Sequence, residues 1–107
     1  MPKVELVTDF LCQSGRVEKG VSFEGIRVRD VLSLAEPLDY RCVRFESLDG
    51  FYLKVGKEIA TSDRSLIVIR MNGSFLTPKR GYPARLFIES LQGPNSLKWL
   101  HRIILTK

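Results

Sequence analysis

Alternation of apolar and polar residues along this chain predicts mainly strands. Residues 3–10 place Val4, Leu6 and Val7 among polar neighbours, which is typical of a strand with one buried face. Residues 65–69 are rich in β-branched side chains and are expected to form a buried strand. Shorter apolar runs predict further extended segments at 21–23, 41–47, 85–89 and 102–106.

Turn and helix signals separate these strands. Asp49-Gly50 and Asn72-Gly73 predict hairpins that lead into residues 51–53 and 74–76, and Glu24-Gly25 is also expected to be a turn. Apolar residues at i, i+3, i+4 and i+7 predict one helix over residues 28–35, with Pro37 as its stop signal and a helical turn at 59–60. The prediction is therefore an α+β fold that is mostly β, with mixed sheets and few short helices.

Length and composition indicate one ordinary globular domain. The chain has 107 residues and 12.2 kDa, with 44% hydrophobic and 27% charged residues, so we expect a single domain over residues 1–107 and exclude a disordered or coiled-coil class. No apolar run approaches the roughly 18 residues of a membrane span. The first five residues lack the apolar stretch of a secretory signal, so a cytoplasmic location is expected.

The cysteine and histidine content restricts the chemistry. The two cysteines, Cys12 and Cys42, lack CxxC spacing, and His101 is the one histidine, so a zinc cluster, a disulfide scaffold and a Ser/His/Asp site are excluded. Cys42 lies in an expected strand and is predicted to pack in the core. Trp99 and the apolar residues after it are also predicted to be core residues.

Charge is distributed unevenly along the chain. Residues 1–53 carry seven basic and nine acidic residues, whereas residues 54–107 carry ten and three. Four cations, Lys79, Arg80, Arg85 and Lys98, stand in or beside two Gly/Pro-containing loops, at 77–85 and 92–98. A basic half of this kind favours an anionic partner such as a phosphorylated cofactor, an oxyanion or a nucleic acid, although solubility alone is the simpler explanation.

Five segments, in this order, resemble the molybdopterin-binding domain of the sulfite oxidase superfamily. They are a cysteine loop (Cys12–Gly15), an aromatic-x-Gly segment before a helix (Phe23–Leu32) and a strand with its turn (Phe45–Gly50). An MNG…L…GxPxR signature (Met71–Arg85) and a G…SxKWL element (Gly93–Leu100) follow. The resemblance covers almost the whole chain and implies the fold of that family. It also implies a molybdenum–molybdopterin cofactor and oxygen-atom transfer on a small-molecule or oxyanion substrate.

The resemblance assigns roles to individual residues. By position, Cys12 is the thiolate ligand of molybdenum, and a soft thiolate suits a metal–sulfur centre. Arg16, just after the cysteine loop, is the one position of this chain that corresponds to a substrate-binding cation of the family. Cys12 and Arg16 are therefore the two residues to which the resemblance assigns a catalytic role. Cofactor binding falls to six positions: Asp49, Arg80, Arg85, Ser96, Leu97 and Lys98. Guanidinium, ammonium and backbone N–H groups are the donors that a cofactor phosphate needs.

Other interpretations remain open at this stage. Only eleven residues precede Cys12 and seven follow Leu100, so the resemblance predicts a minimal cofactor domain that needs a separate electron-transfer partner. A non-catalytic cofactor carrier or a degenerate homologue is the first alternative. A basic nucleic-acid-binding module is the second, since Phe51, Tyr52 and Tyr82 could stack on bases, but no RNP, KH or zinc-finger pattern is present.

Overall fold

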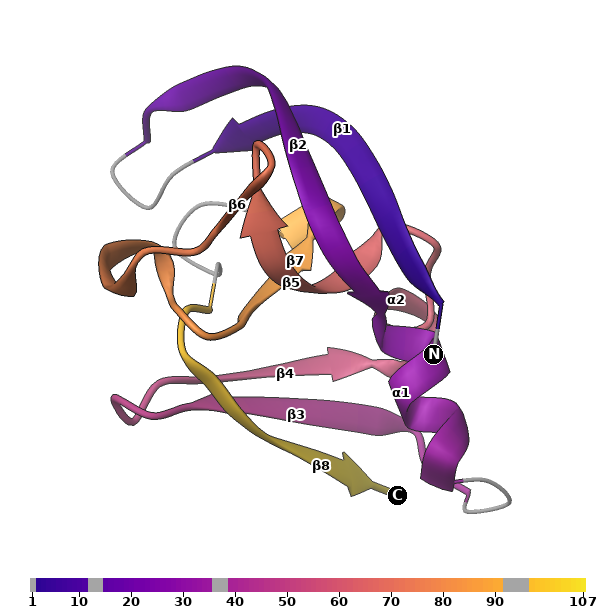
Figure 1. Cartoon of the computed structure of the whole chain (residues 1–107). Helices are drawn as coiled ribbons and strands as arrows, with labels where there is room; N and C mark the ends of the chain where they lie inside the picture. The colour runs from indigo at the N-terminus through magenta and orange to yellow at the C-terminus, as the bar shows by residue number, and fades with distance from the viewer. Residues whose placement is uncertain (1, 12–14, 36–38, 92–96) are drawn as a thin grey trace.

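The computed structural model describes residues 2–11, 15–35, 39–91 and 97–107, and its strands form two sheets (Figure 1). The first sheet has the order β1–β2–β5–β6, with β7 also paired to β5. Its strands are β1 (Lys3–Leu11), β2 (Val17–Arg27), β5 (Ser65–Met71), β6 (Ser74–Phe75) and β7 (Arg85–Ile88). The second sheet has the order β4–β3–β8, with strands Tyr52–Gly56, Cys42–Ser47 and Leu100–Thr106. The α+β prediction is confirmed, and the described strand pairs are antiparallel where mixed sheets were expected.

Helical segments are short and connect the strands. The expected helix is observed as α1 (Val28–Leu32), which continues as the 3₁₀ turn η1 (Ser33–Ala35) between the two sheets. The expected helical turn at 59–60 belongs to α2 (Lys57–Ala60), and two more 3₁₀ turns follow, η2 (Pro78–Arg80) and η3 (Glu89–Leu91). Pro37 lies outside the described residues. In the described part of the chain, no helix has the length and apolarity needed to cross a bilayer.

The predicted turn at Glu24-Gly25 is wrong, because both residues lie inside β2. The pairing of β2 with β5 shifts register between Glu24 and Gly25, so the sequence break reflects a bulge and not a chain reversal. A Cβ atom on Gly25 would lie 2.0 Å from the carbonyl oxygen of Ile67, which is far closer than atoms can approach. The glycine therefore allows the two backbones to come together.

Two apolar clusters form the core, and β7 contributes to both. Leu86 and Ile88 pack with α1 and the three-stranded sheet, whereas Phe87 packs in the cluster beneath β1 and β2. All four residues of β7 are buried, and the ring of Phe87 stacks on that of Phe23 with centroids 4.3 Å apart. Cys42 is half-buried and belongs to neither cluster, in contrast to the core position predicted for it.

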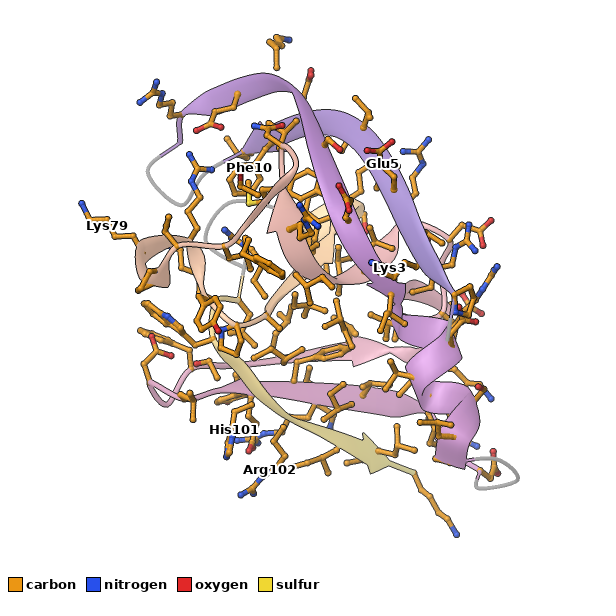
Figure 2. The ribbon with its side chains drawn as sticks, in the orientation of Figure 1. Lys3, Glu5, Phe10, Lys79, His101 and Arg102 are labelled. Atoms are coloured by element: carbon orange, nitrogen blue, oxygen red, sulfur yellow. The ribbon has the colours of Figure 1, made fainter. Side chains whose placement is uncertain are left out.

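Several loops meet at one end of the molecule. Figure 1 shows the β3–β4 turn, η2, the end of β1 and the start of β2 on the left, and α1 and α2 at the opposite end. In Figure 2, Phe10 lies inside the arch of β1 and β2, while Lys79 of η2 points outward. This left-hand end is called the loop end below. Contacts between its segments join residues 16–18, 48–51, 77–85 and 97–99.

Candidate functional site

Arg85 brings a positive charge into the interior of the loop end. It is the first residue of β7 and is 1% exposed, the largest of the fully buried side chains. Its Nη1 donates a hydrogen bond to the carbonyl oxygen of Arg80 at 3.2 Å, and its Cζ lies 4.9 Å from the ring centroid of Phe10. A buried guanidinium is costly unless polar or anionic groups surround it. The Arg80 carbonyl oxygen and the face of the Phe10 ring are two of the groups that stabilise this buried charge.

Arg80 is a second cation of the loop end, and its backbone contacts Arg85. It is the last residue of η2, and its Nη2 lies 3.1 Å from Oε1 of Glu18 on β2. The turn ends at Gly81 with φ of +106°, a conformation that favours glycine. This reversal directs the chain from η2 toward β7 and leaves the Arg80 carbonyl oxygen beside the Arg85 guanidinium.

Residues 97–99 lie directly against this turn. Leu97 is buried and forms a bridge with Leu86, and the amide of Leu100 donates to the carbonyl oxygen of Ala84 at 2.9 Å. A Cβ on Gly81 would be 3.0 Å from Cβ of Lys98, so these two residues are in close contact. Lys98 is half-buried, and its Nζ lies 5.9 Å from the ring centroid of Trp99. The backbones of two loops far apart in the sequence, each carrying cations, therefore pack against each other.

Trp99 connects three segments of the loop end. It is half-buried and in neither apolar cluster, although a core position was predicted for it; the leucines and isoleucine that were grouped with it do pack in the core. Its Nε1 donates to the carbonyl oxygen of Pro78 at 2.9 Å, and its own carbonyl oxygen accepts from the amide of Leu48 at 3.0 Å. Both contacts span long stretches of sequence, so no local pattern could have revealed them.

Asp49 and Arg16 are at the loop end but are separate from this cluster. Asp49 is exposed in the β3–β4 turn, where its carboxylate accepts a hydrogen bond from the Ser47 hydroxyl. Arg16 is exposed one residue before β2. Neither side chain forms a hydrogen bond or ion pair with Arg80, Arg85 or Lys98 within the described residues. The predicted ligands Cys12 and Ser96 lie outside those residues.

The pKa of the Asp9 carboxyl, near the end of β1, lies below its usual value. A hydrogen bond from the Gly20 amide and another from the Lys19 ammonium lower the pKa of this carboxyl. Asp9 stands where the β1–β2 pairing shifts register, between Thr8 and Phe10. Its carboxylate therefore helps to hold the β1–β2 arm whose Phe10 ring contacts Arg85.

The donor set fits a phosphorylated organic cofactor. Arg80, Arg85 and Lys98 are fixed-charge donors, with Glu18 as the carboxylate paired to Arg80. Among the described residues, no group of three or more His, Cys, Asp or Glu side chains is arranged to hold a metal ion. Guanidinium groups bind phosphate oxygens through paired N–H donors, and burial strengthens such contacts. The site therefore suits an anionic ligand.

Comparison with known proteins identifies this ligand class. Residues 1–107 match the family described as the oxidoreductase molybdopterin binding domain. The NADPH nitrate reductase of Fusarium oxysporum is 33% identical over 91 residues, and the NADH nitrate reductase of Spinacia oleracea is 35% identical over 98 residues. Each alignment covers 78% of this chain, but only 10% and 11% of those two proteins.

A solved structure has the same fold. The sulfane dehydrogenase SoxCD from Paracoccus pantotrophus superposes with a TM-score of 0.83 at 19% identity, covering 99% of this chain and 32% of that chain. The chain belongs to the oxidoreductase molybdopterin-binding domain family, of the sulfite oxidase and nitrate reductase type, and molybdopterin is the cofactor that this family binds. The chain spans about a tenth of the length of the curated relatives it matches.

Proposed function

We propose that this chain is the cofactor-holding part of a molybdenum oxidoreductase that transfers an oxygen atom to or from a small oxyanion. The observation that carries the proposal is the buried Arg85, hydrogen-bonded to the turn that contains Arg80 and close to the segment that contains Lys98. Two relatives are named for the reduction of nitrate, which is an oxyanion. The electrons of the reaction pass to or from a separate protein or domain.

The cations hold the anionic end of the cofactor. Arg85 and Lys98 bind phosphate oxygens, and Arg80 adds a third positive charge at the more exposed side of the pair. Because Arg85 is shielded from water, its hydrogen bonds to a phosphate are stronger than those of a surface arginine. The backbone N–H groups of Ser96 and Leu97 complete this set of donors.

The remaining predicted residues act on the pterin, the metal and the substrate. The Asp49 carboxylate accepts a hydrogen bond from the pterin, and the Cys12 thiolate ligates molybdenum. When bound, the cofactor supplies two-electron oxygen-atom chemistry. Arg16 attracts and orients the anionic substrate, a role that suits its exposed position before β2.

The first test is the molybdenum content of the protein. The chain and its Cys12→Ser variant are produced in a host that makes the cofactor, and molybdenum is measured by elemental mass spectrometry together with fluorescence of the released pterin. We expect near-stoichiometric molybdenum in the parent and at least about a tenfold loss in Cys12→Ser, because serine replaces the soft thiolate ligand.

Cys42→Ser is the matched control, since Cys42 is the other cysteine and lies at the start of β3. It should retain the molybdenum of the parent. Pterin that is retained without any dependence of molybdenum on Cys12 would indicate a carrier. Absence of both metal and pterin in a folded parent protein would overturn the proposal.

A further inference from the structure

The outer face of the three-stranded sheet carries a patch of cations and aromatic rings. Residues of β3 alternate strictly between half-buried and buried, which places Arg44 and Glu46 on the outer side. Their register partners on the neighbouring strands are Lys54 and Ile104 for Arg44, and Tyr52 and Arg102 for Glu46. Figure 2 shows Arg102 pointing away from the core beneath this sheet. We call this surface, with Phe51 at its end, the hairpin face.

Phe51 and Tyr52 give one end of the hairpin face an apolar surface. They are 68% and 59% exposed, which is a large fraction for aromatic side chains. A hollow of about 150 Å³ lies beside them, lined by residues of both strands and the turn: Arg44, Glu46, Ser47, Gly50, Phe51 and Tyr52. Tyrosine and arginine around a small hollow are the residue types that dominate protein–protein binding energy.

The charges on this face form a definite pattern. The Glu46 carboxylate accepts from Arg44 at 2.7 Å and lies 3.6 Å from Nη1 of Arg102, so a negative group stands between two positive ones. With Lys54 the face keeps an excess of positive charge, which suits an acidic protein surface. The guanidinium of Arg44 covers one side of the Tyr52 ring, 3.9 Å from its centroid, so that side of the ring is not open for stacking on a nucleic-acid base.

The hairpin face is continuous with the cofactor site. The β3–β4 turn is hydrogen-bonded to Trp99 through the Leu48 amide, and Trp99 directly follows Lys98. Strand β8, which carries Arg102, begins at the next residue. A protein bound on this face therefore lies beside the loops that hold the cofactor.

We propose that the hairpin face is the docking surface for an acidic electron-carrier protein. Aromatic contacts at Phe51 and Tyr52 hold the partner, and Arg44, Lys54 and Arg102 steer it. The inference rests on the proposed function only in naming an electron carrier as the partner.

The test measures binding to two acidic carriers, a plant-type [2Fe–2S] ferredoxin and a flavodoxin, between about 20 and 200 mM salt. The triple variant R44Q/K54Q/R102Q is compared with the parent chain. We expect the parent to bind at least one carrier at low salt and the triple variant to bind at least about tenfold more weakly. The control K3Q/R64Q/R70Q removes three charges on or beside the other sheet and should change the affinity less than about threefold.

Three outcomes would overturn the docking surface. They are an equal loss of affinity in both triple variants, failure of the parent to bind either carrier at low salt, and tighter binding to a single-stranded DNA oligomer than to the carriers. Molybdenum content is measured on the same preparations. Binding of a carrier by protein that holds no molybdenum would support the docking surface and reject the proposed function. Molybdenum in protein that binds no carrier would support the proposed function and reject the docking surface. Equal melting temperatures show that all variants are folded.

Discussion

At the scale of single residues, Arg85 is a charged side chain placed in the interior. It is 1% exposed at the first position of β7, where it donates a hydrogen bond to the Arg80 carbonyl oxygen and lies against the Phe10 ring. The sequence pointed to this residue through its GxPxR motif, but it could not indicate the burial. The burial depends on Phe10 and Arg80, which lie in β1 and η2.

Gly25 gives the sharpest stability prediction at this scale. Replacing Gly25 with alanine should lower the free energy of unfolding by about 1–3 kcal/mol or more, because the new Cβ would collide with the backbone of Ile67 and force β2 away from β5. Urea unfolding measures the change. Gly56→Ala is the control, since nothing lies within 4 Å of its Cβ position, and it should change stability by less than about 1 kcal/mol. Equal effects of the two substitutions would contradict the close approach.

At the scale of elements, most of the fold could be read from the sequence. Strands β1, β5 and β7, helix α1 and both tight turns fall at or near the predicted positions, because each depends on local periodicity or on a turn pair. The turn at Glu24-Gly25 was wrong because a glycine at a bulge gives the same local signal as a glycine at a reversal. The meeting of η2 with residues 97–99 could not be predicted, since it depends on contacts between distant segments.

Trp99 provides a test of how these loops are joined. Trp99→Phe removes the hydrogen bond to Pro78 while keeping an aromatic ring. We expect the free energy of unfolding to fall by about 1 kcal/mol, and the bound pterin to fall further below the parent's level than it does in the control variant. Pterin fluorescence and thermal unfolding are measured on the same samples. Tyr82→Phe serves as the control, because it removes one hydroxyl from an exposed ring in the neighbouring 77–85 loop and should retain the parent's pterin content. Unchanged pterin in Trp99→Phe would show that the loop contact does not position the site.

At the scale of the whole molecule, the two sheets are joined by a strand that both apolar clusters share. Leu86 and Ile88 of β7 face one cluster and Phe87 faces the other, so neither cluster is complete without this strand. The gathering of loops at one end follows from the same arrangement, because β7 starts at the loop end with Arg85. The periodicity of the sequence indicates that residues 85–88 are buried. It does not indicate that two separate apolar clusters lie on either side of this strand, or that the loops gather at one end.

Because β7 is shared, the chain should unfold in a single transition. The fluorescence of Trp99, the one tryptophan, reports on the segment leading into the three-stranded sheet, and far-ultraviolet circular dichroism reports on all strands. Their urea midpoints should coincide, and Phe87→Leu, which removes the stack on Phe23, should lower both midpoints together. Separate midpoints, or a shift of only one of them, would contradict a shared core.

The position of Trp99 between the β3–β4 turn and Pro78 has a thermodynamic consequence. On the proposed docking surface, a ligand that changed the segment around Trp99 would also change the surface of the hairpin, and cofactor binding and partner docking would be linked equilibria. Linkage of this kind is reciprocal: the factor by which the bound cofactor raises the affinity for the carrier equals the factor by which the bound carrier raises the affinity for the cofactor. Through Trp99, a bound partner would then increase the fraction of the protein that holds the cofactor.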